Sequence, residues 1–285
     1  MSDVKPRTRK LLGSFGWHLL ALAIGVVVLY PGAWMLLSSF KPTHQIVGSV
    51  SLIPEHPTLD NFRTALAGIA GVSFWRFFGN SLLLAVGSVV GTVLSASVTA
   101  YAFARIDFPG RRLWFALMIG TLLLPFHVVI IPQYILFNNL GLVDTFVPLL
   151  IGKFLAAEAF FVFLMVQFMR GLPRELDEAA WIDGAGHWRI FRSITLPLMK
   201  PVLATASIFA FIWSWNDFFG PLLYLKNSDL YPLPVALRLF VDQTSTSDYG
   251  AQMAMAVLAL APVIIFFLVF QRYLIGGVAT TGLKG

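Results

Sequence analysis

The chain has 285 residues, of which 58% are hydrophobic and only 12% are charged, and its mean hydropathy is +0.79. About a quarter of the residues of a soluble domain carry a charge, so this composition excludes an ordinary soluble protein and indicates one that lies in lipid. The absence of cysteine excludes disulfides and thiolate metal sites and argues against redox chemistry. We predict a single all-α membrane domain over residues 1–285.

Six apolar runs are long enough to cross the hydrocarbon core, which takes about 20 residues of helix. They cover residues 17–39, 77–103, 113–137, 146–169, 201–225 and 252–274. The first run follows basic residues, as the apolar part of a signal peptide does. It is too long for a signal peptide and has no small-residue cleavage site, so we expect a retained anchor.

Lysine and arginine gather in alternate loops between the runs. The N-terminal tail has four, the 104–112 turn three, the 170–200 loop five and the C-terminal end two, against five in all the other loops together. Because these residues resist transfer across the membrane, we predict that both termini and the 170–200 loop are cytoplasmic. This topology explains the net charge of +6 without nucleic acid as a partner.

Small side chains recur every four residues along the second run, at Gly87, Gly91, Ser95 and Thr99. Such a stripe lets another helix backbone approach closely. We predict that it serves helix packing rather than ligand binding.

Prolines interrupt several of the runs, and each removes a backbone hydrogen bond that lipid cannot replace. We predict bends rather than binding sites at Pro31, Pro125, Pro132 and Pro221. The third run is the best exception, because two of its prolines flank Phe126 and His127. A lone histidine is no proton relay, so we interpret His127 as a packed polar residue.

Glu158 is the only acidic residue well inside a run, and an ionised carboxylate at the bilayer centre costs about 2.5 to 3.5 kcal/mol. We therefore expect it to face the interior of the helix bundle. It can contact a solute there, or form a gate ion pair with Lys153. A structural hydrogen bond or a silent, protonated acid is equally consistent with the sequence.

The segment between the fourth and fifth runs, residues 170–200, is charged and helix-forming. Pro173 suits the first turn of a helix, where its missing N–H would be unpaired anyway. Acids follow near the positive end of the helix dipole, at Glu175, Asp177 and Glu178. A narrow apolar stripe has helical spacing, at Leu172, Leu176, Ala179 and Ala180. We predict a short helix that Gly184 ends by taking the left-handed conformation.

A second short helix follows, with Trp188, Phe191 and Ile194 three apart on one side and Pro197 at its end. The two helices are predicted to form an elbow along the membrane surface. Small residues let such an elbow seat in a groove of a soluble partner, where its acids pair with basic groups. The alternative is an amphipathic helix that rests on lipid headgroups, and the residues alone leave both open.

Parts of this elbow resemble, nearly position by position, the cytoplasmic Glu-Ala-Ala loop of binding-protein-dependent ABC importer permeases. They are Glu178-Ala179-Ala180, Asp183-Gly184-Ala185, Phe191 and Leu196-Pro197. From about residue 77 onward, further segments are similar to the carbohydrate-uptake, maltose-permease-like branch: residues 100–105, 108–111, 215–218, 271–276 and 282–285. One departure is Gly282-Leu283-Lys284 preceded by Ala279-Thr280-Thr281, where that branch often has a more uniform Gly-Ala tail.

The resemblance implies the type I ABC importer permease fold, with six transmembrane helices and cytoplasmic coupling helices. It implies a subunit that moves a sugar or related solute across the inner or plasma membrane of a bacterium or archaeon. The implied partners are a second, non-identical permease, two cytoplasmic ATP-binding subunits, an extracytoplasmic solute-binding protein and membrane lipid. ATP hydrolysis then belongs to a separate subunit, so we expect no catalytic residue, cofactor or metal in this chain. The resemblance assigns coupling to the ATPase to Glu175, Glu178, Ala179, Ala180, Asp183, Gly184 and Ala185.

Candidates for the solute path lie in the fourth and fifth runs, with Glu158 in the fourth. Counted from residue 201 at 1.5 Å per residue, Asn216 and Asp217 lie about 22 Å along the fifth run, in its outer half. With Trp213 and Trp215 beside them, they suit a sugar, which offers C–H faces to aromatic rings and hydroxyls to amides and carboxylates. An interfacial aromatic belt with snorkelling polar groups is the competing interpretation.

Two other classes of protein compete with the importer. An intramembrane enzyme needs convergent catalytic groups, but the runs contain no Ser/His, paired-Asp or His-rich constellation. An ion-coupled secondary carrier that acts without an ATPase predicts inverted repeats and several embedded ionisable residues, for which Glu158 is thin support. Gly277 and Gly282 mimic the spacing of a phosphate loop, but Leu283 precedes Lys284 and no strand precedes them, so we exclude ATP binding by this chain.

Overall fold

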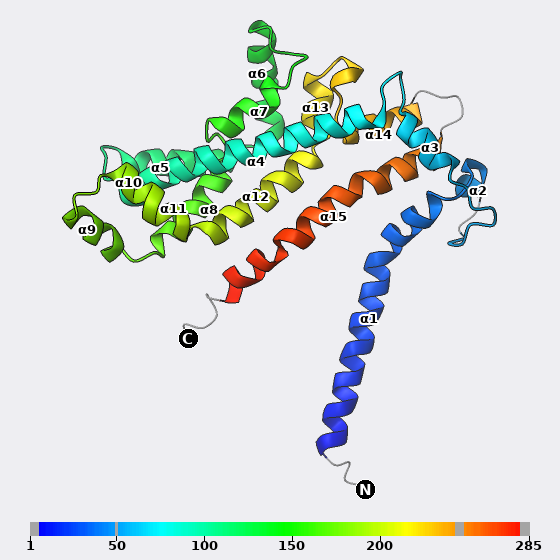
Figure 1. Ribbon diagram of the computed structural model, residues 1–285, viewed down its shortest axis with the longest axis horizontal. Coiled ribbons are helices and arrows are strands. Elements are labelled where there is room, and N and C mark those ends of the chain that lie inside the picture. Colours follow the sequence, from blue (N-terminus) through cyan, green and yellow to red (C-terminus); the bar gives the residue numbers. More distant parts are fainter. Residues whose placement is uncertain (1–5, 49–50, 243–247, 280–285) are drawn as a thin grey trace. The chain divides into compact units, whose positions relative to one another are not determined.

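The computed structural model describes residues 6–48, 51–242 and 248–279, and these residues are almost entirely helical. Lys5 of the basic tail and the expected tail motif at residues 282–285 lie outside them, as do the side chains of residues 271–276. The helices are α1 Pro6–Ser38, α2 Thr43–Gly48, α3 Asp60–Ala67, α4 Phe74–Arg105, α5 Arg111–Thr121, α6 Phe126–Asn139, α7 Val147–Phe154, α8 Ala159–Arg170, α9 Glu175–Ile182, α10 His187–Ile190, the π-helix η1 Phe191–Thr195, α11 Leu196–Leu198, α12 Lys200–Trp215, α13 Phe219–Tyr224, the 3-10 helix η2 Ser228–Leu230, α14 Leu233–Asp242 and α15 Tyr249–Ala279. Figure 1 shows them in chain order by colour.

The expected all-α membrane fold is confirmed. Within the described residues, four helical stretches are long and apolar enough to cross a membrane: Trp17–Ser38, Phe74–Arg105, Val147–Arg170 and Tyr249–Phe270. Two bent helix pairs bring the number to six if each pair is counted as one span.

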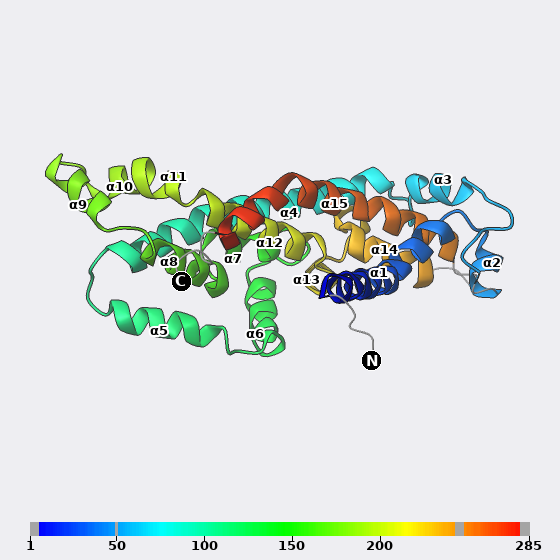
Figure 2. The ribbon, with the colours of Figure 1, turned by 90° about the horizontal axis from the view of Figure 1, so that it is seen from below.

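The bend predicted at Pro125 is confirmed, and it divides the third run into two helices. α5 ends at Thr121, and α6 begins at Phe126 with its axis turned by 100° (Figure 2). Pro125 has an extended ψ of 129°, and the residue before a proline avoids the helical region, so the chain cannot continue as one helix there. Pro132 lies inside α6 without ending it.

The fifth span also differs from the expected residues 201–225. α12 ends at Trp215, and α13 begins only at Phe219. The break contains Asn216 and Asp217, two of the candidates for the solute path. At its other end, α12 follows the elbow's second helix with a bend of 76°.

The chain forms two compact units. The smaller, Met1–Ala67 with Phe240–Leu258, is joined by polar contacts between distant residues. Thr43 Oγ1 donates to Asp248 Oδ1 at 3.0 Å, and the buried Asn61 donates to the carbonyls of Ser39 and Lys41 at 2.8 and 2.7 Å. The two bonds from Asn61 satisfy backbone carbonyls just beyond the end of α1.

The larger unit, Gly68–Leu239 with Ala259–Gly285, is built around α4, which packs on α7, α8 and α12. α4 and α12 run side by side in Figure 1. Alanines four residues apart on α4 face large residues of α8 in one buried cluster, with Ala96, Ala100 and Ala104 against Phe161, Met165 and Met169. Small residues let the two backbones approach, which is how helices pack where lipid removes the hydrophobic drive.

The small-residue stripe of α4 packs against α7, as predicted. A Cβ added at Gly91 would lie 2.8 Å from Phe154 Cδ2 and 3.1 Å from the Lys153 carbonyl carbon. Ser95 Oγ donates to the Lys153 carbonyl at 2.6 Å. Any larger residue at Gly91 would therefore push α7 away from α4.

Candidate functional site

The elbow forms as predicted in its first half. α9 runs over Glu175–Ile182 and carries its acids in the first turn. Gly184 has φ 77°, and the N–H of Ala185 donates to the Ala180 carbonyl at 2.9 Å, which closes the helix. A Cβ at Gly184 would meet no atom within 4 Å, so only the backbone conformation favours glycine there.

The second half is three short helices rather than one. α10, the π-helix η1 and α11 follow one another from His187 to Leu198, so the helix passes Pro197 by one residue. Trp188 and Phe191 lie on this half with ring centroids 5.5 Å apart, but Trp188 is exposed and Phe191 is buried. Phe191 packs on Tyr101 of α4, with ring centroids 5.2 Å apart, so this half of the elbow rests on α4.

A buried ion pair joins α9 to the end of α4. Arg105 Nε lies 3.1 Å from Asp177 Oδ2, with side chains only 5% and 9% exposed. Arg105 also donates from Nη2 to the carbonyl of Leu172 at 3.0 Å. Breaking such a pair by removing one partner typically costs about 3–5 kcal/mol, because the other charge is left buried. The sequence context of Arg105 indicates only a role in setting the membrane topology. The ion pair shows that Arg105 also holds α9 against the end of α4.

Most of the predicted coupling residues lie on one exposed face. Counted at 100° per residue, six exposed residues of the elbow fall within less than half a turn. We call them the elbow face: Glu175, Leu176, Glu178, Ala179, Ile182 and Asp183. Gly184 is exposed beside it, and Ala185 is half-buried.

Ala180 corrects the expectation that both alanines seat in a partner's groove. Its side chain is only 9% exposed and belongs to the buried cluster of α4 and α8. Only Ala179 is free to contact another protein. Ile182, which is 88% exposed, is a member of the face that sequence reasoning missed, although its spacing from Ala179 indicates it.

A second candidate site begins at the break between α7 and α8. Ala156 there has φ 53°, a left-handed conformation that is unfavourable for a residue with a Cβ. The break brings Lys153 and Glu158 into an ion pair in the middle of the span Val147–Arg170. Thr92 Oγ1 of α4 donates to Glu158 Oε2 at 3.4 Å. The ion pair considered from the sequence is thus present, with about a third or less of each side chain exposed.

Three of the four candidates for the solute path share one pocket. Its volume is about 390 Å³, and it is lined by Trp213, Asn216 and Asp217 together with Lys153 and Phe126. Glu158 does not line it and reaches it through Lys153. The pocket thus has two aromatic faces, an ammonium group, an amide and a carboxylate.

The polar groups of this pocket are held by the break after α12. Asn216 Nδ2 donates to the Ile212 carbonyl at 2.8 Å, and Asp217 Oδ1 accepts from the N–H of Gly220 at 3.1 Å. Trp215 points elsewhere: it is 3% exposed and donates from Nε1 to the Ala259 carbonyl at 3.0 Å. Trp215 is therefore a core residue and belongs neither to the pocket nor to an interfacial belt.

Comparison with known proteins decides the family. Residues 87–279 match the family described as the binding-protein-dependent transport system inner membrane component. The chain belongs to this family. The matched residues contain the whole elbow and the broken helices of the pocket.

Individual relatives match this chain over most of its length. The chain is 34% identical to the diacetylchitobiose uptake system permease protein NgcG of Streptomyces coelicolor, over 92% of this chain and 86% of the relative. It is 32% identical to the galactooligosaccharides transport system permease protein GanQ of Bacillus subtilis, over the full length of both. A crystal structure of a bacterial ABC transporter involved in the import of the acidic polysaccharide alginate matches with a TM-score of 0.81 and 26% identity, over 95% of this chain and 99% of that one. The chain is therefore a multi-pass membrane permease of the ABC importer type, and not an enzyme.

Proposed function

We propose that this permease carries a sugar or a related solute inward, driven by ATP that is hydrolysed on separate subunits. The names of its relatives support a carbohydrate, since they transport diacetylchitobiose and galactooligosaccharides. The proposed assembly contains a second, non-identical permease, two cytoplasmic ATP-binding subunits and an extracytoplasmic solute-binding protein, in the cell membrane of a bacterium or archaeon. Both termini and the elbow are cytoplasmic in this proposal, because the basic residues gather on that side.

The Arg105–Asp177 ion pair is the observation that carries the mechanical part of the proposal. An ATPase that grips the elbow face moves α9, and the buried pair transmits that motion to the end of α4. Tyr101 adds a second connection through Phe191. A force on the elbow therefore moves α4 rather than only the loop.

α4 also holds the broken helix that forms the pocket. Ser95 donates to the Lys153 carbonyl, and Thr92 donates to Glu158, so both ends of the α7–α8 break are bonded to α4. Movement of α4 then shifts Lys153, which lines the pocket. The physical contacts are continuous from elbow to pocket, and mutation is needed to measure the coupling that they carry.

Coupling involves all seven residues predicted for it, in two different roles. Glu175, Glu178, Ala179 and Asp183 contact the ATPase directly. Ala180 and Ala185 pack the elbow on its own core, and Gly184 sets the turn between them. The pocket offers Trp213 to a sugar's C–H face, and Asn216 and Asp217 to its hydroxyls.

The first test adds the same bulky cation at two exposed positions of the elbow. Ala179→Arg changes the elbow face, whereas Ser193→Arg changes η1 outside it. We expect Ala179→Arg to abolish co-purification of the ATPase and ATP-driven uptake in proteoliposomes, and Ser193→Arg to preserve both. Equal effects of the two variants would contradict docking through the elbow face. Solute uptake by the permease alone, without ATP, would instead identify an ion-coupled secondary carrier.

A further inference from the structure

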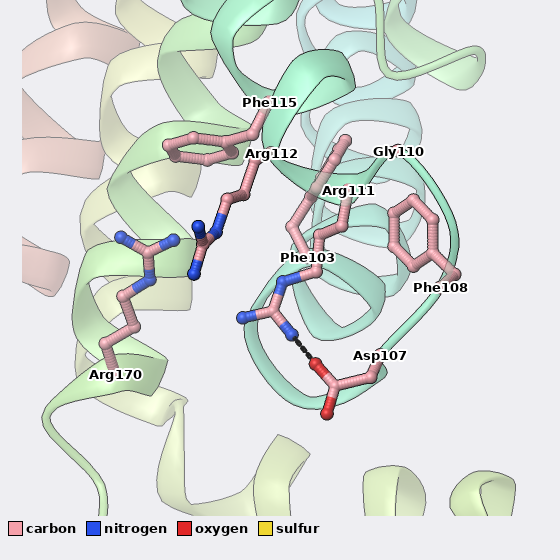
Figure 3. Close-up of a pocket in the computed structure, with 8 residues that line it drawn as sticks. All are labelled: Phe103, Asp107, Phe108, Gly110, Arg111, Arg112, Phe115 and Arg170. Atoms are coloured by element: carbon pink, nitrogen blue, oxygen red, sulfur yellow. Dashed lines mark hydrogen bonds and ion pairs between the residues drawn. The ribbon is translucent and has the colours of Figure 1, made fainter.

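A larger pocket lies where α4 ends, α5 begins and α8 ends. Its volume is about 560 Å³. Three guanidinium groups line it, from Arg111, Arg112 and Arg170, together with the rings of Phe103 and Phe115 (Figure 3). Asp107 supplies the only carboxylate of the lining. The pocket is thus a cationic cavity with apolar walls, separate from the solute pocket and from the elbow face.

One of the three arginines is already paired. Arg111 Nη1 donates to the Ile106 carbonyl at 3.1 Å and forms an ion pair with Asp107. The side chain of Arg111 is only 24% exposed, so the turn itself fixes it. The single carboxylate of the lining is therefore used by Arg111.

The other two arginines have no such partner. None of the ion pairs found among the described residues includes Arg112 or Arg170. The Arg170 guanidinium lies 4.9 Å from the centre of the Phe115 ring, which orients it without neutralising it. Figure 3 shows the Arg112 and Arg170 guanidinium groups extending into the same space beside Phe115. Two like charges repel there unless an anion lies between them.

The chemistry of the two free groups indicates a phosphate. A guanidinium group binds phosphate oxygens through two parallel hydrogen bonds, and two such groups facing one cavity match the several oxygens of one phosphate. A lone carboxylate on a partner protein would fill much less of a pocket of this volume. The site is therefore suited to a phosphate group on a larger molecule.

The surroundings of the pocket indicate a lipid as that molecule. Leu113, Trp114 and Leu117 form an exposed apolar face of α5 next to Arg112, at 62%, 59% and 53% exposure. Tryptophan is typical of the membrane surface, where basic clusters attract anionic headgroups. We propose that Arg112 and Arg170 bind the phosphate of an anionic phospholipid, whose acyl chains lie along this face of α5. The assignment requires only that this end of α4 lies at a membrane surface, so it stands or falls separately from the solute that the permease carries.

Native mass spectrometry of the complete importer in lipid nanodiscs tests the site. The probe is dioleoylphosphatidylglycerol, with zwitterionic dioleoylphosphatidylcholine as the reference lipid. We expect the double variant Arg112→Gln/Arg170→Gln to retain phosphatidylglycerol at least about ten-fold less tightly than wild type, as loss of charge-assisted hydrogen bonds predicts. Arg192→Gln, which removes an exposed arginine of η1 outside the pocket, is the matched control and should bind like wild type.

Several outcomes would overturn the proposal. Equal lipid retention by the double variant and the control would show that the pocket does not select the lipid. Displacement of the lipid by millimolar inorganic phosphate would assign the arginines to a soluble phosphate instead. A cross-link from this pocket to an acidic residue of another subunit would identify a protein contact. If the glutamine variant does not assemble, Arg112→Lys/Arg170→Lys replaces it, and unchanged phosphatidylglycerol affinity there would contradict a bidentate arginine site.

Discussion

Gly184 and Gly186 lie two residues apart in the elbow, in open surroundings but with different backbone conformations. A Cβ added at either meets no atom within 4 Å. Gly184 has φ 77°, whereas Gly186 has φ −76°. Alanine therefore adds strain of about 1–2 kcal/mol at residue 184 and none at residue 186. The pair separates the effect of the turn from the effect of an added methyl group.

We expect Gly184→Ala to lower solute uptake per ATP hydrolysed in proteoliposomes, because the strained turn changes the angle between the two halves of the elbow. Membrane insertion and assembly should stay normal, since no neighbouring atom is displaced. Gly186→Ala should match wild type in the same assay. Indistinguishable coupling in the two variants would mean that the left-handed turn is not needed for transmission.

Among single residues, the role expected from the sequence differs most from the observed contacts at Arg105 and Asp177, which form a buried ion pair. The sequence indicates a topological role for Arg105, because arginines are common in cytoplasmic turns. Its partner lies far along the chain, so no local spacing connects the two. Asp177 does carry a usable signal: it is an acid on the side of α9 opposite the elbow face, and a helical projection separates it from Glu175 and Glu178. Glu175, Glu178 and Ala179, by contrast, are exposed as their pattern predicts.

At the scale of elements, a break that contains no proline is harder to predict than the helices themselves. Hydropathy indicates one span each for residues 113–137 and 201–225, because it measures how apolar the residues are and not whether their backbone is continuous. Pro125 predicts the first of the two breaks, and the bend there is confirmed. The break after Trp215 has no proline within it, and Asp217 there accepts a hydrogen bond from the Gly220 N–H.

The break between α7 and α8 yields a prediction about paired charges. Lys153 and Glu158 neutralise each other within a span, where a lone charge costs about 2.5–3.5 kcal/mol. Lys153→Met or Glu158→Gln alone should lower the melting temperature of the purified complex, because each leaves one charge unpaired. The double variant should be more stable than either single variant.

Transport measurements then distinguish a structural pair from a functional one. We expect the double variant to recover stability but not uptake, because Lys153 also lines the solute pocket. Thr92→Val removes one hydrogen bond to Glu158 but leaves both charges and the bond from Ser95 to the Lys153 carbonyl, so it should lower uptake less than the double variant does. Full uptake by the double variant would assign the ion pair a structural role only.

For the whole molecule, composition alone indicates an all-helical membrane protein, and this class is confirmed. Lipid imposes this result, because a chain in the bilayer must satisfy its backbone within helices. The connection from elbow to pocket could not be predicted in the same way. It depends on tertiary bonds from α4 to Asp177, Lys153 and Glu158. These residues are far from α4 in the sequence, and no local pattern shows which of them will meet it.

The proposed orientation of the whole permease can be measured with single cysteines. The chain has none, so one introduced cysteine is a unique label site. Asp183→Cys reports on the elbow face, and Lys226→Cys reports on the exposed segment after α13, where the hydrogen bonds of Lys226 to Asp144 and Tyr231 are made by its backbone. In sealed right-side-out vesicles, a membrane-impermeant maleimide should label Lys226→Cys at once and Asp183→Cys only after the vesicles are opened.

Bound ATPase should then protect Asp183→Cys but not Lys226→Cys. Labelling of both cysteines from the same side would contradict the topology, and unprotected labelling of Asp183→Cys in an assembled complex would contradict docking at the elbow face.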